Sequence, residues 1–514
     1  MKRPWLPACT AMLLLTAGCG ENAPQSEAAE RAVKLIDPDE VSPEALRAAV
    51  SDQRMRGFYA ARDWQPAWTR ETTPGLVEAL DGSARHGLDP RDYLGPVEAA
   101  QGPVAREAAL TRAAFDLADA LGDGKADPAE IFEIYTLPHP KLDLAAGLSA
   151  ALGEGNVGEW IEALAPRDPE YRALSDAYVL QIERAAKGAA RSIGEGEAIH
   201  PGDDDPRVPQ VAEVLRANGY LAASVPDEGD PSTRYTPELA AAVERMQEDY
   251  GIEPDGVIGK GTLELLNTGS AERARTLAVN LERRRWLARQ VPATRIDVNT
   301  AAAVLTYFRD GKGRDRRRVV VGQPDWETPQ LGSPMFRLVA NPTWTVPKSI
   351  EEDEIAGRGA GYLARNNMIR KDGWIVQQPG PKNALGLVKF DLQNDHAIYL
   401  HDTPAKALFG ENQRHYSHGC VRVDDALGFA RLLAQDAGVL REFDKARATG
   451  KETFVKLSER IPVRLLYHTA FADSAGKVHF RTDPYGWDDR VAEALGFEPR
   501  QLRRLQQHLS DVGP

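Results

Sequence analysis

The chain has 514 residues, of which 42% are hydrophobic and 27% are charged, and this balance excludes both a polytopic membrane protein and a wholly disordered chain. The length suits about three domains, and the mean hydropathy of -0.42 fits globular bodies. The formal net charge of -13 opposes a general attraction to phosphate backbones, so we expect no nucleic-acid partner.

The N-terminal residues have the pattern of a secretory signal. Lys2 and Arg3 precede an apolar stretch that ends at Leu15, and small residues follow it. The stretch is shorter than the roughly 20 residues that a membrane-spanning helix needs. We therefore expect residues 1–18 to be a signal peptide that is removed on export.

Cys19 ends a short motif, beginning at Leu15, that resembles the lipobox of bacterial lipoproteins, with Thr16 at the usual aliphatic position. The resemblance implies that Cys19 is lipidated and that acyl chains hold the protein to a membrane. Gly20, in place of the aspartate associated with inner-membrane retention, favours the outer membrane. We expect a lipid-anchored periplasmic protein, and ordinary cleavage to a free periplasmic protein is the alternative.

The positions of the three cysteines leave one of them as a candidate reactive residue. Cys9 leaves with the signal and Cys19 would be acylated, so Cys420 is the one cysteine left inside the fold. An exported protein with one internal cysteine forms no internal disulfide. Its thiol is then either buried and inert or chemically reactive.

The N-terminal half is predicted to be helical. Residues 19–45 lack periodicity and are rich in Ala, Glu, Pro and Ser, which predicts a flexible tether. Residues 46–200 are predicted to form a helical scaffold, because apolar residues recur there at the spacing of one helix face. The clearest set is Leu110, Ala114, Leu117 and Leu121. We expect an aromatic cluster to lie in the scaffold core. It consists of Phe58, Tyr59, Trp64, Pro66 and Trp68.

Residues 206–270 form a compact unit in which Thr236 and Pro237 mark the start of a helix, as its cap and its first position. A set of residues in this unit resembles the three-helix peptidoglycan-binding domain of cell-wall enzymes. The set is Gln247, Asp255, Gly256, Val257, Ile258, Gly259, Thr262, Leu266 and Asn267. The resemblance implies a role at the cell wall, and a helical spacer without a ligand is the alternative.

After a helical connector over 271–290, the period of the apolar residues changes to two, which predicts a mainly β domain over 291–470. Asp310 and Gly311 predict a hairpin turn between two of its strands. The predicted strands are Ile296 with Val298, Leu305–Phe308, Val319–Val321, Leu387–Phe390 and Ala397–Leu400.

Residues 349–385 are rich in glycine and charge and interrupt the strand pattern, which predicts an insertion in the β domain. We expect Trp374 in this insertion to pack in a core. Residues 471–514 are a C-terminal extension. The fold class is therefore multidomain α+β, with a helical scaffold, a three-helix unit and a mainly β domain that carries an insertion.

The residues able to carry chemistry gather between His401 and Arg422. A cysteine at its ordinary pKa of about 8.5 is mostly protonated at neutral pH, so a nucleophilic Cys420 needs a nearby base or positive charge. His401 precedes Cys420 by 19 positions, enough chain for a loop to bring the two side chains together. His418 would share a face with Cys420 if the segment between them is extended. Gly419 would let a substrate approach backbone N–H groups that stabilise an oxyanion.

The sequence Ser-His-Gly-Cys-Val-Arg from Ser417 to Arg422, with a histidine upstream, resembles the signature of YkuD-type L,D-transpeptidases. The likeness runs from about residue 46 to about residue 490 and is closest to the long, YcbB-like branch, in which 349–385 would be a substrate-capping subdomain. It is carried by Asn341, Pro342, Trp344, Val346 and Pro347, by Pro379, Gly380, Asn383, Ala384, Leu385 and Gly386, and by Tyr399–Thr403.

The resemblance implies a cysteine acyltransferase of cell-wall biogenesis. Cys420 would be the nucleophile and His401 its general base, oriented by a backbone carbonyl near Asp402, while His418 would assist catalysis. The implied substrate-binding residues are Tyr399, Asp402, Ser417, Gly419 and Arg422. The planar fork of Arg422 suits a substrate carboxylate, and a buried structural pair is the equal alternative.

The implied reaction joins two peptidoglycan stem peptides without a cofactor or a metal. The thiolate attacks the third residue of a tetrapeptide donor, expels D-alanine and leaves a thioester. A diaminopimelate amine of an acceptor stem then forms a 3→3 cross-link. The same resemblance implies that carbapenem β-lactams acylate Cys420.

Other interpretations of these residues remain open. Water or a protein amine in place of the acceptor stem would give L,D-carboxypeptidase activity or attachment of a protein to the wall. The chain would alternatively be a non-catalytic wall-binding scaffold. Finally, His401, His415, His418 and Cys420 are zinc-ligand types, although they lack the paired spacing of a metal motif.

Overall fold

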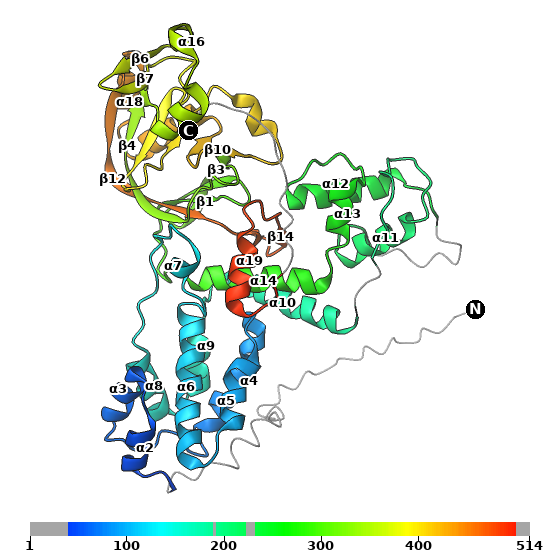
Figure 1. Cartoon of the computed structure of the whole chain (residues 1–514), viewed down its shortest axis with the longest axis vertical. Coiled ribbons are helices and arrows are strands. Elements are labelled where there is room, and N and C mark those ends of the chain that lie inside the picture. The colour runs from blue at the N-terminus through cyan, green and yellow to red at the C-terminus, as the bar shows by residue number, and fades with distance from the viewer. Residues whose placement is uncertain (1–39, 189–191, 223–231, 500–514) are drawn as a thin grey trace, which may run out of the picture. The chain divides into compact units, whose positions relative to one another are not determined.

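The computed structural model describes residues 40–188, 192–222 and 232–499 (Figure 1). The predicted signal peptide, Cys19, most of the tether and the end of the C-terminal extension lie outside these described residues. Within the described ranges, no helix is long and apolar enough to cross a membrane. The described residues divide into two compact units, one of residues 40–81 with Arg91–Ala114 and Ala145–Trp160, and one of Gly82–Pro90 with Phe115–Leu144 and the described residues between 161 and 499.

The N-terminal part is helical, as predicted. The helices are α2 (Pro43–Ala49), α3 (Gln53–Ala60), α4 (Thr73–Gly82), η2 (Ser83–His86), α5 (Pro90–Ala99), α6 (Pro103–Gly122), α7 (Pro128–Ile131), α8 (Leu144–Glu154), α9 (Val157–Leu164) and α10 (Pro169–Ala186). The predicted apolar stripe of α6 is fully buried from Leu110 to Leu121. In the first unit the predicted aromatic cluster is core, except for half-buried Pro66. The buried Glu107 carboxylate organises that core, since it accepts from the Tyr59 hydroxyl at 2.9 Å and from the Ala67 N–H at 2.6 Å.

Three helices, α11 (Val208–Ala217), α12 (Pro237–Tyr250) and α13 (Lys260–Leu266), form the small unit that the sequence predicts (Figure 1). Thr236 caps α12, and its side chain accepts from the Leu239 N–H at 3.3 Å. Gln247 is 1% exposed and its side-chain amide reaches Asp255, Thr262 and the N–H of Gly256 at 2.9–3.0 Å. These motif residues therefore hold the turn between α12 and α13.

Helix α14 (Ser270–Arg285) follows and is buried on most sides although it is rich in arginine. Helix α19 (Trp487–Leu495) supplies the matching carboxylates: Arg283 lies 2.5 Å from Asp488 and Arg275 lies 2.5 Å from Asp489. Buried charges need such partners. The C-terminal extension thus packs onto the connector helix.

The β domain contains a nine-stranded sheet whose order is β10-β3-β11-β9-β8-β4-β12-β1-β2, and a β2–β3 pairing closes it into a barrel. Its strands are β1 (Arg295–Asn299), β2 (Val304–Arg309), β3 (Lys312–Gly322), β4 (Leu331–Ala340), β8 (Val388–Leu392), β9 (Leu400–His401), β10 (His415–Ser417), β11 (Val421–Val423) and β12 (Thr453–Leu466). The predicted turn at Asp310 and Gly311 is present, with φ of 52° and 78°. Alternate strand residues fill the core with α17 (Ala426–Asp436) and α18 (Leu440–Ala448). A short helix η4 (Lys406–Gly410) precedes β10, and a hairpin of β13 (Ala470–Ala472) and β14 (Val478–Phe480) follows β12.

The predicted insertion forms a small subdomain with its own core. It comprises β5 (Trp344–Thr345), α15 (Lys348–Ile350), η3 (Glu351–Ile355), α16 (Gly359–Arg365), β6 (Met368–Lys371) and β7 (Trp374–Gln377). Its sheet begins at Trp344, before the predicted boundary at 349. The expectation that Trp374 is core is wrong: it is 41% exposed, and Lys348 lies 4.9 Å from its ring centre. Trp344 fills that core instead.

Candidate active site

Two neighbouring parallel strands bring the predicted nucleophile and base to one face of the sheet. In the β9–β11 register, Leu400 stands opposite Val421 and His401 opposite Arg422. Leu400 and Val421 point into the barrel core, so the next residue on each strand points to the other face. Cys420 directly precedes β11 and stands opposite Tyr399, whose carbonyl accepts from the Val421 N–H at 3.1 Å.

The strand that carries His401 is shorter than predicted. Ala397–Leu400 was expected to be extended, but Ala397 has a φ of 56° and β9 begins only at Leu400. Asn394 holds this irregular approach, because its side chain accepts from the Ile398 N–H at 3.2 Å and donates to the Ile398 carbonyl at 2.8 Å. The irregular segment ends beside the thiol, where Cys420 Sγ lies 3.8 Å from the Ala397 carbonyl oxygen.

The loop before Cys420 is fixed from within. The Ser417 hydroxyl donates to the Cys420 carbonyl at 2.6 Å and accepts from the Gly419 N–H at 3.2 Å. The Gly419 carbonyl accepts from Thr328 at 2.9 Å. Gly419 has a φ of 103°, a conformation that side chains strongly disfavour, which explains glycine at this position.

His401 is fully buried, and its ring orientation is set by a backbone carbonyl. Its Nδ1 lies 2.5 Å from the Asp402 carbonyl oxygen, as the family resemblance implied. Because a carbonyl only accepts, Nδ1 carries the hydrogen and Nε2 keeps its lone pair in the neutral ring. The Tyr399 ring packs edge-on to the imidazole at 5.7 Å.

The Cys420 thiol is a free, buried group, 5% exposed. Burial raises the pKa of the Cys420 thiol to about 11, and this rise is opposed by hydrogen bonds from Tyr399 and by the positive charges of Lys389 and Arg422. Burial, together with the neighbouring thiol, also raises the pKa of Tyr399. The thiol is therefore protonated at rest and sits among groups that favour its thiolate.

Lys389 was not among the predicted site residues. It stands opposite His401 in the β8–β9 pairing, with its Nζ 4.1 Å from the centre of the Tyr399 ring and 2.9 Å from Asp391. The sequence signal that could have found Lys389 is the alternation of core and non-core residues along β8. Val388 and Phe390, on either side of Lys389, are both core, so Lys389 lies on the opposite face of the sheet. The antiparallel pairing of β8 with the next strand, β9, brings it to the site.

Three predicted site residues make contacts that hold the local structure. Ser417 is fully buried, and its hydroxyl ties the loop before Cys420. The Asp402 carboxylate accepts from the Leu387 N–H at 2.8 Å and pairs with Lys406, which fixes the turn before β8. The backbone between His418 and Cys420 is not extended, because Gly419 turns the chain. The His418 ring packs edge-on to the Trp326 ring, with the ring centres 4.9 Å apart.

Arg422 is 1% exposed and stands on the face that carries His401. The zinc-ligand types do not converge. His415 Nε2 lies 3.0 Å from the Thr300 carbonyl oxygen, and burial lowers the pKa of His415 to about 4. Over the described ranges, no three His, Cys, Asp or Glu side chains gather as a metal site.

Models of three protein families match separate parts of the chain. Residues 293–444 match the L,D-transpeptidase catalytic domain named YkuD. The chain contains a YkuD L,D-transpeptidase catalytic domain. Residues 53–177 match a scaffold domain, and residues 204–266 match the family described as "Putative peptidoglycan binding domain". The YkuD match includes every residue placed above around the Cys420 thiol.

A curated protein that is similar to part of this chain is also described as an L,D-transpeptidase. A protein of Haemophilus influenzae (strain ATCC 51907 / DSM 11121 / KW20 / Rd), described as "Putative L,D-transpeptidase", is 31% identical over 220 residues. The match covers 38% of this chain and 45% of that protein, so the chain spans less than half the length of this relative.

Two solved structures are also similar. The L,D-transpeptidase (Yku) from Stackebrandtia nassauensis is 14% identical, with a TM-score of 0.23, and the match covers 54% of this chain and 97% of that one. The Ldtfm-avibactam carbamoyl enzyme is 16% identical, with a TM-score of 0.21, and the match covers 34% of this chain and 49% of that one.

Proposed function

We propose that the YkuD domain forms 3→3 cross-links between peptidoglycan stem peptides through a thioester on Cys420, releasing D-alanine from tetrapeptide donors. The observation that carries the proposal is the parallel pairing of β9 and β11, which puts Cys420 and His401 on one face. A nucleophilic cysteine needs a base nearby, and His401 is the histidine that this pairing places on the face of Cys420.

In the first step, the thiol proton moves to Nε2 of His401 and Sγ attacks the carbonyl carbon of the third stem residue. The tetrahedral intermediate then breaks its C–N bond. The proton held by His401 passes to the departing amine of D-alanine, and the acyl group remains on Cys420 as a thioester.

In the second step, the acceptor amine loses a proton to His401 and attacks the thioester carbonyl. The C–S bond breaks, the new amide is released, and the proton returns to the Cys420 thiolate. The energy of the cleaved amide is held in the thioester, so no ATP is needed. Because the same histidine takes and returns a proton in both steps, its fixed tautomer serves the whole cycle.

The Cys420 thiol is protonated at neutral pH, because burial raises its pKa to about 11. Proton transfer to His401 during attack avoids a free thiolate, while Lys389 and Arg422 stabilise the developing negative charge.

One backbone donor near the thiol is open to the oxyanion. The Gly419 N–H is bound to Ser417 and the Val421 N–H to the Tyr399 carbonyl. The Cys420 N–H has no hydrogen-bond partner among the described residues. We infer that it binds the oxyanion of the tetrahedral intermediates, with the Tyr399 hydroxyl as the neighbouring donor.

The wider setting of the reaction is part of the proposal. The three-helix domain would hold the chain on peptidoglycan, and carbapenem β-lactams would acylate Cys420 because their strained carbonyl is open to the same thiolate. The pattern ending at Cys19 supports a lipid anchor in the periplasm, with the outer membrane favoured.

Purified disaccharide-tetrapeptide tests the function directly. Incubation with the full chain, followed by mass analysis, should yield a dimer that has lost one D-alanine. A disaccharide-tripeptide alone would mean that water is the acceptor, which contradicts cross-linking. Unchanged substrate with wild type would contradict acyl transfer altogether. The matched control is Cys420→Ala, which should form neither product.

A further inference from the structure

The outer face of the sheet near β1 is polar and rich in arginine. Along β1 the buried residues Ile296 and Val298 alternate with Arg295, Asp297 and Asn299, and β2 alternates in the same way. The pairing register places Asp297 opposite Arg464 of β12 and Thr306 of β2, and Thr306 opposite Arg316 of β3. One row across four strands therefore carries charge on the side away from the core.

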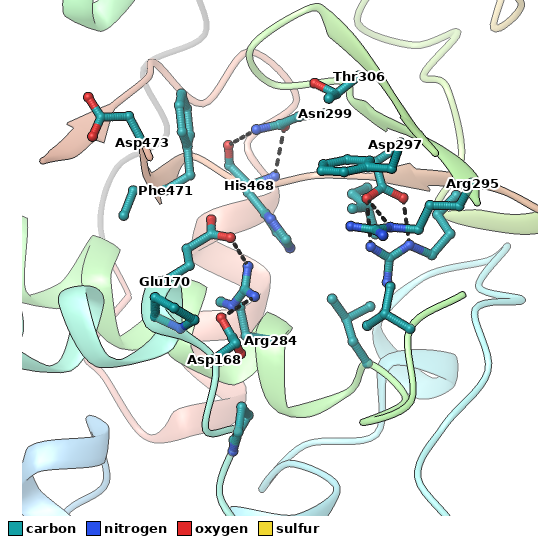
Figure 2. A pocket seen from close by; sticks show the side chains of 18 of the residues that line it. Asp168, Glu170, Arg284, Arg295, Asp297, Asn299, Thr306, His468, Phe471 and Asp473 are labelled. Atoms are coloured by element: carbon teal, nitrogen blue, oxygen red, sulfur yellow. Dashed lines mark hydrogen bonds and ion pairs between the residues drawn. The ribbon is translucent and has the colours of Figure 1, made fainter. Parts of the chain in front are cut away.

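This face is the floor of a groove of about 1600 Å³. The start of α10, the end of α14 and the β13–β14 hairpin contribute its other walls (Figure 2). Tyr399, His401, Cys420 and Arg422 are not among its lining residues, so the groove is separate from the candidate active site.

The lining has an excess of positive charge, with eight arginines against five carboxylates, although the whole chain carries -13. Asp297 is shared by two guanidinium groups, Arg464 at 2.7 and 2.8 Å and Arg295 at 2.8 Å. Arg316 is exposed and makes no ion pair with the described residues. Guanidinium groups held in this way suit carboxylate ligands, which they bind bidentately.

A buried histidine points into the groove. His468 is 6% exposed, and its backbone is held on both sides by Asn299, at 3.0 and 3.1 Å. Figure 2 shows its imidazole directed down between Arg284 on one side and the Arg295–Asp297 pair on the other. Its ring nitrogens bond to no other described residue, and the ring lines the groove, so these nitrogens are available to a ligand there.

We propose that this groove is a second peptidoglycan site, which binds the carboxylates of a stem peptide other than the one at Cys420. The inference rests on the proposed function, since it takes peptidoglycan as the substrate. Stem peptides carry several carboxylates, and the groove offers arginines on its floor and an imidazole aimed at its interior. The rings of Phe308 and Phe471 supply apolar surface beside these charges.

The test uses the full chain bearing Cys420→Ala, with disaccharide-tetrapeptide as the probe and histidine ring NMR signals as the readout. The signal of His468, assigned with His468→Gln, should move on titration. An added carboxylate should also raise the pKa of His468, which burial and the nearby arginines hold well below its usual value. A His468 signal that does not move at saturating probe overturns the proposal.

Charge reversal supplies the matched comparison. Arg316→Glu should weaken the affinity reported by the His468 signal by about tenfold or more. Lys312→Glu, on the same strand but outside the groove, should leave it within about twofold. Equal effects of the two variants overturn the proposal, as does tighter binding of triglutamate or of neutral chitotetraose than of the tetrapeptide probe.

Two measurements on the wild type, product formation and the His468 signal, separate this inference from the proposed function. Wild type that forms cross-linked dimer while the His468 signal stays fixed would overturn only the groove. Wild type that binds the probe at His468 and releases no D-alanine would overturn only the transpeptidase proposal.

Discussion

Nδ1 of His401 lies 2.5 Å from the carbonyl oxygen of Asp402, the next residue in the chain. This contact fixes the tautomer that leaves Nε2 able to accept a proton. Asp402 is itself held by the Leu387 N–H, so the base is oriented by the turn before β8. The site therefore depends on backbone geometry as much as on side chains.

His401→Gln should lower kcat/KM for disaccharide-tetrapeptide by about 10²–10⁴-fold, because it removes the group that takes and returns the proton. The rate of D-alanine release measures the effect. His396→Gln is the matched control, since His396 is an exposed histidine on the preceding loop. A loss of less than about tenfold in His401→Gln would show that another group is the base.

Lys389→Met should raise the pKa of the Cys420 thiol further, because the Lys389 charge is one of the groups that oppose the effect of burial. Thiolate is the reactive form, so iodoacetamide labelling at a fixed pH below that pKa should slow, and the labelling profile should shift to higher pH. Lys456→Met, an exposed lysine on β12, is the control. An unchanged profile would remove Lys389 from the site.

Ser417→Ala should destabilise the protein by about 1–3 kcal/mol, because it leaves the buried Cys420 carbonyl and Gly419 N–H without their partner. Urea denaturation gives the free energy of unfolding. Ser458→Ala removes an exposed serine hydroxyl that donates to a backbone carbonyl and should cost less. An equal cost for both variants would contradict the role assigned to the Ser417 hydroxyl.

The predicted strands and the candidate catalytic pair, Cys420 and His401, rest on different signals in the sequence. Strict alternation at Ile296 and Val298 reports burial directly, and the run from Ser417 to Arg422 is specific enough to identify its family. Lys389 was missed, because the register of β8 with β9, and no sequence motif, brings it to the site. The loop-tying hydrogen bonds of Ser417 were also not predicted, because a motif does not reveal which of its residues hold the local backbone.

The sequence also did not predict which aromatic residue fills the core of the insertion, or that the arginine-rich outer face of the sheet lies in a groove. Large aromatic residues are usually buried, and that rule placed Trp374 in a core, but Trp344 from outside the predicted insertion fills it. Arg314 and Arg316 of β3 line the arginine-rich groove. Their inclusion in a groove depends on α10 and α14, which local sequence does not reveal.

The contact between α12 and the C-terminal hairpin should weaken as pH rises. Hydrogen bonds to Asp249 at 2.9 Å and Asp473 at 3.0 Å raise the pKa of His479 above 6.5, against the effects of burial and of the nearby charge of Lys477. A raised histidine pKa gives stability that is complete below about pH 6.5 and is lost as pH rises through the folded-state pKa.

Hydrogen-exchange protection factors for β14 measure this effect. They should fall between about pH 6 and pH 8 in the wild type and change less in His479→Gln. The same fall in both proteins would show that another group is responsible. Protection that rises with pH would contradict a stabilising role for the protonated His479 ring.

A thioester at Cys420 is the intermediate on which the proposed transpeptidase function depends. Intact-protein mass spectrometry after rapid mixing with disaccharide-tetrapeptide should show an adduct equal to the donor minus D-alanine. Peptide mapping should place it on Cys420, and both Cys420→Ala and hydroxylamine treatment should abolish it. Product formed at an undiminished rate by Cys420→Ala, or an adduct mapped to another residue, would contradict catalysis through this thiol.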